Sequence, residues 1–213
     1  MSESKYIVVE GPIGVGKTSL AIRLAEVLGA RKILERSEDN PFLANFYQSR
    51  ETYAFQTQIF FLLSRYQQQK ELIQQELFAQ NTVSDYLFPR DRIFAQLNLT
   101  SDELSLYEKV YQLLNPRVSA PDLVVYLQAR TDVLLKRLKK RDRLYERGLS
   151  PEYLEEVVEA YNSFFYRYEE TPLLVVNSSE IDFVETPTDL ADLVKEIRSV
   201  KKGVQHYIPL GSK

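Results

Sequence analysis

The sequence predicts a single α/β domain over residues 1–200, with a five-stranded parallel sheet flanked by helices. Five short runs of apolar and β-branched residues alternate with longer segments whose apolar residues recur at helical spacing, an order typical of right-handed crossovers. The run Leu-Val-Val-Tyr-Leu at residues 123–127 is typical of a strand buried on both faces. With 213 residues and 44% hydrophobic content, the chain can bury one sizeable core. We expect the tail, residues 201–213, to be mobile.

The first strand, residues 6–9, leads into a glycine-rich loop that fits the pattern G-x-x-x-x-G-K-[ST]. The loop reads Gly-Pro-Ile-Gly-Val-Gly-Lys-Thr and opens into a helical stripe that stops at Gly29. Glycines let backbone N–H groups point at an anion and a helix N-terminus adds partial positive charge, so this loop predicts a phosphate-binding site. Lys17 should reach the β/γ-phosphates of a nucleoside triphosphate, and Thr18 should hold Mg²⁺. The expected phosphate-binding residues are Gly11, Pro12, Ile13, Gly14, Val15, Gly16, Lys17, Thr18 and Ser19.

Residues 32–35 predict a second strand that ends at Glu35, and Asn40-Pro41 then favours a short helix over residues 42–48. Open α/β sheets bind their ligands at the carboxyl ends of the strands. Glu35 is therefore a candidate general base, although an ordinary solvated acid before a loop fits the same pattern equally well.

A long helix is expected over residues 52–80, with an apolar stripe that belongs to the core. Gln58 and Arg65 interrupt the stripe and lie on the same face, two turns apart. They could line a pocket together. Polar residues on such a face more often lie at a rim near solvent, and the spacing alone favours that interpretation.

Residues 81–85 form a short β-prone run that ends in Asp85. An acid ends many strands by chance, but a phosphate-binding loop already requires a metal partner. Asp85 is therefore a candidate for a second protein contact to Mg²⁺.

Three later helices have predicted N-caps. Thr100 and Glu103 form a capping box, Thr131 should cap the helix after the strand at residues 121–127, and Ser150 precedes a proline at a helix start. The fifth strand is expected at residues 173–176, and a last helix follows a polar loop.

A basic segment at residues 136–147 contains seven Lys or Arg in a net-acidic protein, and four of the seven are arginines. Cations suit a helix C-terminus, which accounts for some of them. Arginine is preferred where forked contacts to oxygen matter, so the segment indicates a phosphate partner.

The composition excludes several classes of function. A net charge of −3 gives no basic field for polymeric nucleic acid or an anionic membrane. The absence of cysteine excludes disulfides and thiolate chemistry, and the single His206 cannot form a multi-histidine site, so any metal must be held by oxygen ligands. No apolar segment is long enough for a leader or a membrane span, and we expect a cytoplasmic protein.

Taken together, these motifs resemble the deoxynucleoside kinase family, in particular its bacterial deoxyadenosine, deoxyguanosine and deoxycytidine kinases. The resemblance covers nearly the whole chain and rests on the order and spacing of residues 11–19, 35–47, 53–65, 84–95 and 140–148. It implies a P-loop kinase fold with an arginine-rich lid and transfer of the ATP γ-phosphate to the 5′-hydroxyl of a deoxyribonucleoside. It also implies a homodimer built from the helices at residues 53–80 and 104–114.

The resemblance assigns roles to individual residues. It makes Glu35 the base for the 5′-hydroxyl, and it places Asp85 and Thr18 on Mg²⁺. Tyr47 and Glu146 would bind the sugar 3′-hydroxyl, while Gln58, Arg65 and Asp91 would contact the base. Arg137, Arg141 and Arg143 would close the lid over the donor phosphates, and the loop with Asp182 and Phe183 would face the donor adenine. Lys17, Arg141 and Arg143 would supply catalytic positive charge.

Two positions depart from the family pattern. Tyr86, which we count among the expected substrate-binding residues, stands where the family usually has an arginine directly after the metal-binding acid. Asp142 replaces the usual lid glycine, which could change how the lid closes.

Gln58 and Asp91 predict the base preference. A glutamine amide pairs with the adjacent amino donor and ring acceptor of adenine or cytosine, whereas guanine shows two adjacent donors there. Deoxyadenosine or deoxycytidine is therefore the expected substrate. A nucleoside monophosphate kinase is the nearest alternative, with Arg36 and Arg50 as the early candidates for an acceptor phosphate. A GTP-dependent switch protein is disfavoured because the chain has no D-x-x-G or N-K-x-D sequence.

Overall fold

A computed structural model describes residues 5–75, 81–115 and 119–209 of the chain. Its six strands are β1 Tyr6–Glu10, β2 Arg31–Ile33, β3 Thr82–Ser84, β4 Leu123–Gln128, β5 Leu173–Asn177 and β6 Val204–Tyr207. The α-helices are α1 Lys17–Leu28, α2 Leu43–Gln48, α3 Arg50–Gln75, α4 Asp91–Asn98, α5 Ser101–Leu114, α6 Thr131–Arg141, α7 Pro151–Tyr166 and α8 Pro187–Ser199. Three 3₁₀ turns, η1 Ser37–Asp39, η3 Phe88–Arg90 and η5 Leu144–Gly148, lie in the connections.

The strands form one parallel sheet in the order β2-β3-β1-β4-β5-β6. The α/β class is confirmed, but the expected count of five strands is wrong. The sixth strand lies in the tail, where Val204 to Tyr207 pair with Leu173 to Val176 of β5. The end of the tail, residues 210–213, lies outside the described part of the chain.

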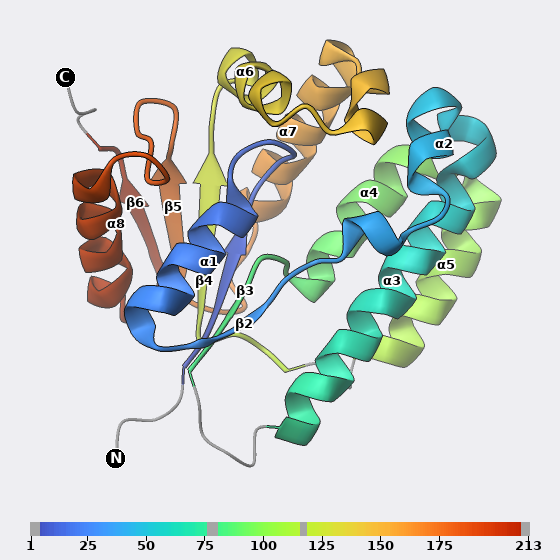
Figure 1. Cartoon of the computed structure of the whole chain (residues 1–213). Coiled ribbons are helices and arrows are strands. Elements are labelled where there is room, and N and C mark those ends of the chain that lie inside the picture. The colour runs from blue at the N-terminus through green and yellow to red at the C-terminus, as the bar shows by residue number, and fades with distance from the viewer. Residues whose placement is uncertain (1–4, 76–80, 116–118, 210–213) are drawn as a thin grey trace.

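Helices cover both faces of the sheet (Figure 1). Alternate residues of the central strands face opposite cores, as the period of a strand requires. Val9, Val125 and Val176 pack with α1 and α8, whereas Val8, Val124 and Val175 pack with α4 and α7. A third cluster joins α3 to α5 through Leu62, Tyr107 and Tyr111.

Most expected helices are present, with shifted ends. The capping box of Thr100 and Glu103 and the Ser150 N-cap are confirmed. Thr131 is the first helical residue rather than the cap, because α6 has Arg130 at the N-cap position without a side-chain bond. The short helix α2 begins after an Asx turn in which Asn40 Oδ1 accepts the Phe42 N–H at 3.0 Å. The expected end of α3 at residues 76–80 lies outside the described residues.

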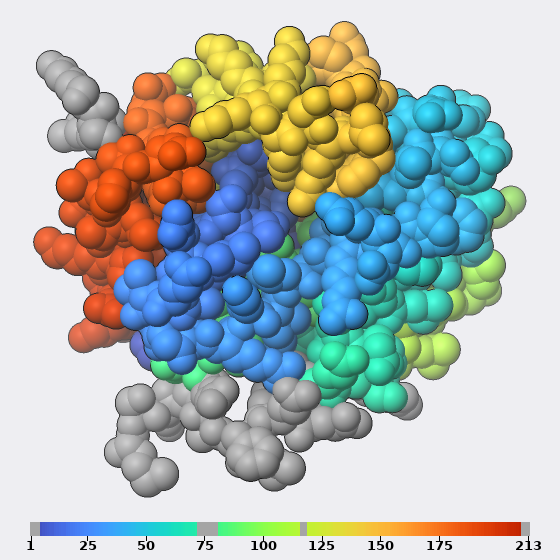
Figure 2. All heavy atoms as spheres, viewed as in Figure 1, coloured from blue at the N-terminus to red at the C-terminus, as the bar shows by residue number. Residues whose placement is uncertain are grey.

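Because all the strands are parallel, their carboxyl ends meet at one edge of the sheet. The glycine-rich loop, Glu35, Asp85 and the loop after β5 all follow strands at this edge. The segment of α6 and η5 lies over the same edge, and Figure 2 shows a hollow beneath it. Among the described residues, no helix is long and apolar enough to cross a membrane.

Candidate active site

The glycine-rich loop connects β1 directly to α1, as the sequence predicts. Gly14 and Gly16 have φ angles of 83° and 104°, which favour glycine. A Cβ on Gly14 would lie 2.9 Å from Cγ of Leu138, so the loop also needs glycine to pack against α6. Lys17 Nζ donates to the carbonyl oxygens of Gly11 and Pro12 at 2.8 and 3.1 Å. Burial lowers the pKa of Lys17 to about 8, partly opposed by the carboxylate of Glu10.

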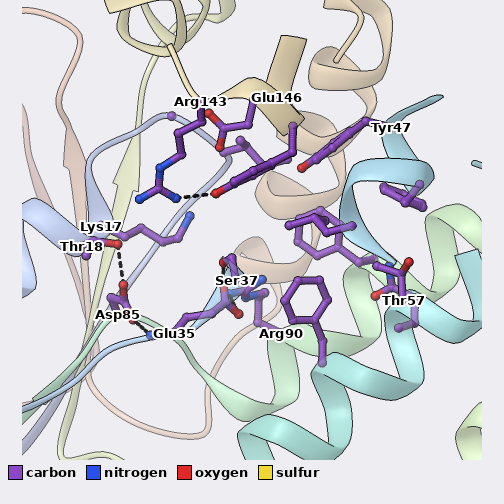
Figure 3. Close-up of a pocket in the computed structure, with 18 of the residues that line it drawn as sticks. Lys17, Thr18, Glu35, Ser37, Tyr47, Thr57, Asp85, Arg90, Arg143 and Glu146 are labelled. Atoms are coloured by element: carbon purple, nitrogen blue, oxygen red, sulfur yellow. Dashed lines mark hydrogen bonds and ion pairs between the residues drawn. The ribbon is translucent and has the colours of Figure 1, made fainter. Parts of the chain in front are cut away.

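Thr18 and Asp85 lie together at the start of α1. Thr18 Oγ1 donates to Asp85 Oδ2, and Asp85 Oδ1 accepts the backbone N–H of Glu35 at 2.7 Å (Figure 3). Burial and the nearby Glu35 carboxylate raise the pKa of Asp85, so a cation at this point would be favourable. A hydroxyl and a carboxylate oxygen beside a phosphate loop are a donor set that suits Mg²⁺.

Glu35 lies two residues beyond the end of β2 and is bound by two arginines. Its Oε1 accepts from Arg65 Nε at 2.7 Å, from Arg65 Nη2 and from Arg90 Nη2 at 3.4 Å. Burial alone would raise the pKa of Glu35, but Arg65 and Arg90 outweigh it and bring the pKa to about 2. Within the described residues, Oε2 accepts only from Ser37 Oγ, at 3.3 Å, and can take a further donor. Glu35 is therefore an ionised carboxylate with one oxygen available to a ligand, not an ordinary solvated acid.

Gln58 and Arg65 project from α3 into the main cavity, which also contains Lys17, Glu35 and Asp85. Their exposed fractions are 2% and 3%, so they are not rim residues exposed to solvent. The Gln58 side chain makes no hydrogen bond to any residue in the part of the chain that the structure describes. A buried amide without a protein partner can bind a polar ligand.

Two expected substrate-binding residues do not line this cavity. Asp91 is fully buried beneath Arg65, where one carboxylate oxygen pairs with Arg65 Nη1 and the other accepts from Tyr107 OH at 2.7 Å. Tyr86 is fully buried in a small cluster with Ile33 and Tyr6. Asp91 can act on a ligand only through Arg65, and Tyr86 belongs to the core.

The opposite wall of the cavity carries Tyr47 and Glu146, the two residues predicted to bind the sugar 3′-hydroxyl. Glu146 lies in η5, near Tyr47 (Figure 3). It pairs with Arg141, whose Nε donates to Oε2 at 3.1 Å. The Tyr47 ring stacks with the ring of Tyr145, with centroids 6.4 Å apart. Gly148 allows η5 to approach α2, because a Cβ there would lie 2.9 Å from the carbonyl oxygen of Tyr47. Burial and neighbouring Tyr153 and Glu146 raise the pKa of Tyr47 well above its ordinary value, so its neutral hydroxyl can donate.

The expected lid arginines differ in their surroundings. Arg137 donates to the carbonyl oxygens of Val15, Ser178 and Ile181 at 2.8 to 3.0 Å, which ties α6 to the phosphate loop. Arg143 Nη1 donates to Tyr145 OH at 2.6 Å. Arg137 therefore braces the backbone, while Arg141 and Arg143 line the cavity.

A second cavity lies on the other side of the phosphate loop. It is lined by Gly14, Val15, Gly16, Ser19, Arg137, Lys140, Arg141, Asp182, Phe183, Val184 and Glu185. The ring of Phe183 lies close to Gly16. The predicted donor-binding residues Asp182 and Phe183 line this second cavity, whereas Gln58 lines the first. The two cavities offer separate places for two ligands.

The structure also brings in residues that the sequence reasoning missed. Arg90 lines the main cavity, and Glu10 lies directly behind it in contact with its guanidinium. Glu10 is an acid at the end of a strand. The same feature made Glu35 and Asp85 candidates, so it could also have indicated Glu10. Tyr145, Phe61 and Phe94 also line the cavity, but apolar residues at helical spacing gave no reason to separate them from the core.

Comparison with known proteins bears on the identity of this site. The profile of the family described as deoxynucleoside kinase matches residues 7–202. Deoxyadenosine kinase of Dictyostelium discoideum is 36% identical over 201 residues, which cover 91% of this chain and 79% of that one. Deoxyguanosine kinase of Bacillus subtilis (strain 168) is 32% identical over 205 residues, covering 94% and 99%.

Solved structures of similar proteins support the same family. The structure of deoxyadenosine kinase from M. mycoides with bound dATP superposes with a TM-score of 0.78 at 26% identity, covering 92% of this chain and all of that one. The family match spans the phosphate loop, the acids at the strand ends and the lid segment. This chain belongs to the deoxynucleoside kinase family and is an ATP-dependent kinase that phosphorylates nucleosides.

Proposed function

We propose that this enzyme transfers the γ-phosphate of ATP to the 5′-hydroxyl of deoxyadenosine or deoxycytidine. The observation that carries the proposal is the Gln58 amide, 2% exposed and without a hydrogen bond to the described residues, in the cavity that contains Glu35. The names of the relatives do not choose a base, since they include deoxyguanosine, deoxyadenosine and deoxyadenosine/deoxycytidine kinases.

The amide of Gln58 offers one acceptor and two donors. It can pair with the adjacent amino donor and ring-nitrogen acceptor on the edge of adenine or cytosine. Guanine shows two adjacent donors, for which a glutamate would be better suited, and thymine has no amino group. Because the oxygens of Asp91 are bound by Arg65 and Tyr107, this preference rests on Gln58 alone.

In this proposal, Glu35 Oε2 accepts a hydrogen bond from the 5′-hydroxyl. A carboxylate with a pKa of about 2 is a weak base, but it is ionised at every working pH and can orient the hydroxyl. The hydroxyl becomes acidic as its oxygen bonds to phosphorus, and the loose transition state of phosphoryl transfer needs positioning and charge stabilisation more than strong base catalysis. Lys17, Arg141 and Arg143 surround the point of transfer with positive charge.

Thr18 and Asp85 would hold Mg²⁺ together with the donor phosphates. The ion would neutralise charge on the β- and γ-phosphates. The protein's part is to hold two oxygen donors in place, and the Glu35 N–H fixes the orientation of Asp85 at 2.7 Å.

A nucleoside monophosphate kinase would need cations for an acceptor phosphate. Neither early candidate, Arg36 or Arg50, lines the cavity, and Arg50 instead lies over the ring of Tyr153 at 4.3 Å. Phosphorylation of dAMP in place of deoxyadenosine would favour that alternative.

The proposal is tested by kcat/KM for the four deoxynucleosides at one ATP and Mg²⁺ concentration. We expect deoxyadenosine or deoxycytidine to be best, deoxyguanosine weaker and thymidine poorest. A missing hydrogen bond in a buried site costs about 1 to 3 kcal/mol, or roughly ten- to a hundred-fold. Deoxyguanosine or thymidine as the best substrate would overturn the proposal.

We also propose a homodimer formed through α3 and α5, which pack side by side at one edge of the molecule (Figure 1). Leu63 on α3 and Leu106 and Leu113 on α5 are 48%, 51% and 72% exposed, which is typical of surfaces that partners cover. Light scattering should give about twice the monomer mass of 24.8 kDa, and Leu113→Asp should halve it. A monomeric wild type would contradict the proposal.

A further inference from the structure

A buried ion pair, Glu10 with Arg90, lies beside the reacting end of the main cavity. Glu10 ends β1, directly before the phosphate loop, and has no exposed surface. Its Oε1 accepts from Arg90 Nε at 2.8 Å and from the Leu87 N–H at 2.7 Å, while Oε2 accepts the Gly11 N–H at 2.9 Å. This carboxylate therefore fixes the Arg90 guanidinium relative to the first residue of the phosphate loop.

Arg90 is held in place but is not saturated. Nη2 reaches Glu35 Oε1 at 3.4 Å, and Nη1 makes no hydrogen bond to any residue within residues 5–75, 81–115 and 119–209. The ring of Phe94 lies 5.5 Å from the guanidinium carbon and restricts its orientation. Figure 3 shows Arg90 beside Glu35 in the cavity that Lys17 also lines.

Arg65, the other buried arginine near Glu35, is different. Its Nε and Nη2 bind Glu35 and its Nη1 pairs with Asp91, so all three nitrogens are engaged. Arg65 can orient Glu35, and each of its nitrogens already faces a carboxylate oxygen. Of these two arginines, Arg90 is the one with a terminal nitrogen, Nη1, that faces no acceptor among the described residues.

Lys17 and Arg90 both line the reacting end of the cavity. Glu10 and Glu35 each contact Arg90 and leave its Nη1 without an acceptor among the described residues. A transferring phosphoryl group carries negative charge on three oxygens, and a planar guanidinium can contact two of them.

We propose that Arg90 is a catalytic residue that contacts the phosphoryl group during its transfer, and that Glu10 positions it. The inference rests on the proposed deoxynucleoside kinase reaction. In that reaction the bond from the γ-phosphorus to the β-phosphate oxygen breaks, a bond to the 5′-oxygen forms, and the hydroxyl proton passes to Glu35. Arg90 stabilises charge in this step and exchanges no atom.

The test must separate catalysis from folding. Removing Arg90 alone would leave Glu10 as an uncompensated buried charge, which is costly, whereas replacing both partners removes the two charges together. We therefore choose Glu10→Gln/Arg90→Met as the variant without the guanidinium and Arg90→Lys as the conservative variant. Arg92→Met is the control, because Arg92 follows Arg90 by two residues, in the first turn of α4, but pairs with Glu108 nearer the surface, 2.8 Å away.

We expect kcat of the double variant to fall by ~10³-fold or more, as for other arginines that contact a transferring phosphoryl group. The dissociation constants for nucleoside and ATP, measured by calorimetry, should stay within about fivefold of wild type. Arg90→Lys should recover part of kcat because it keeps the charge and loses the fork. Arg92→Met should match wild type in both quantities.

The possible failures are distinct. If wild type phosphorylates none of the deoxynucleosides, the proposed function fails and this inference falls with it. If wild type is active and the folded double variant keeps kcat within about tenfold, or loses binding as strongly as kcat, this inference alone is overturned. Should the double variant not fold, Arg90→Lys decides, and an unchanged kcat in that variant contradicts the inference.

Discussion

Glu35→Gln removes the negative charge that lies between two buried arginines. Arg65 and Arg90, each 3% exposed, would keep their positive charges and lose their shared carboxylate. The variant should therefore lose both catalysis and stability. Loss of a general base costs about 10²- to 10⁴-fold in rate, and we expect kcat to fall within that range.

The loss of stability follows from the pKa of Glu35, which is about 2 instead of its ordinary 4.5. At ~1.4 kcal/mol for each pKa unit, the ionised carboxylate contributes about 3 kcal/mol to the free energy of unfolding. Because the folded pKa is the lower one, this contribution is complete above pH 4.5 and disappears as the pH falls through about 2. At neutral pH, Glu35→Gln should lower the free energy of unfolding by about 3 kcal/mol, and the difference from wild type should shrink below pH 4.5.

Urea unfolding of both proteins across this pH range measures the effect. Glu26→Gln is a matched control, because Glu26 is exposed and its side chain pairs, among the residues that the structure describes, only with Arg23 on the surface of α1. The control should change the free energy of unfolding by less than about 1 kcal/mol. A Glu35→Gln protein as stable as wild type at neutral pH, or one whose deficit does not depend on pH, would refute the reasoning.

Three further predictions follow from the site. Lys17→Ala should fold and be nearly inactive, and wild-type activity in this variant would exclude the phosphate-loop assignment. In the wild-type enzyme, kcat/KM for ATP should fall as the pH rises through about 8, where Lys17 loses its charge. Gly148→Ala should raise KM for the nucleoside more than KM for ATP, because its Cβ would meet the Tyr47 carbonyl 2.9 Å away and separate η5 from α2; equal changes would contradict this. Deoxyadenosine should have a higher kcat/KM than adenosine. Tyr47, which we expect beside the sugar, stacks with Tyr145 and would leave little room for a 2′-hydroxyl; equal values would be evidence against it.

The parts of the fold that the sequence predicted depend on local constraints. The phosphate loop requires glycines at positive φ, and the capping box requires two side chains three residues apart, so both are visible in a short stretch of sequence. The spacing of Gln58 and Arg65 correctly placed them on one face of a helix. It could not show that the face borders a cavity, since that depends on what packs opposite.

The parts that were missed depend on distant partners. Strand β6 has mostly exposed residues and is held by hydrogen bonds to β5, so it has no apolar pattern to reveal it. Asp91 was expected at the base, but its carboxylate is bound by Arg65 and Tyr107 from two other helices. Arg90 is held at the cavity by a contact with Glu10, eighty positions earlier in the chain.

The proposal that Gln58 recognises the base is tested most directly by the preference between deoxyadenosine and deoxyguanosine after Gln58→Glu. The matched control is Gln67→Glu, which makes the same change on the exposed side of α3. In Gln58→Glu, the ratio of kcat/KM for deoxyadenosine to that for deoxyguanosine should fall by roughly ten- to a hundred-fold, because a carboxylate accepts from both donors of guanine. The ratio should not change in Gln67→Glu. A ratio that stays at the wild-type value in a folded Gln58→Glu enzyme would contradict the claim that Gln58 recognises the base.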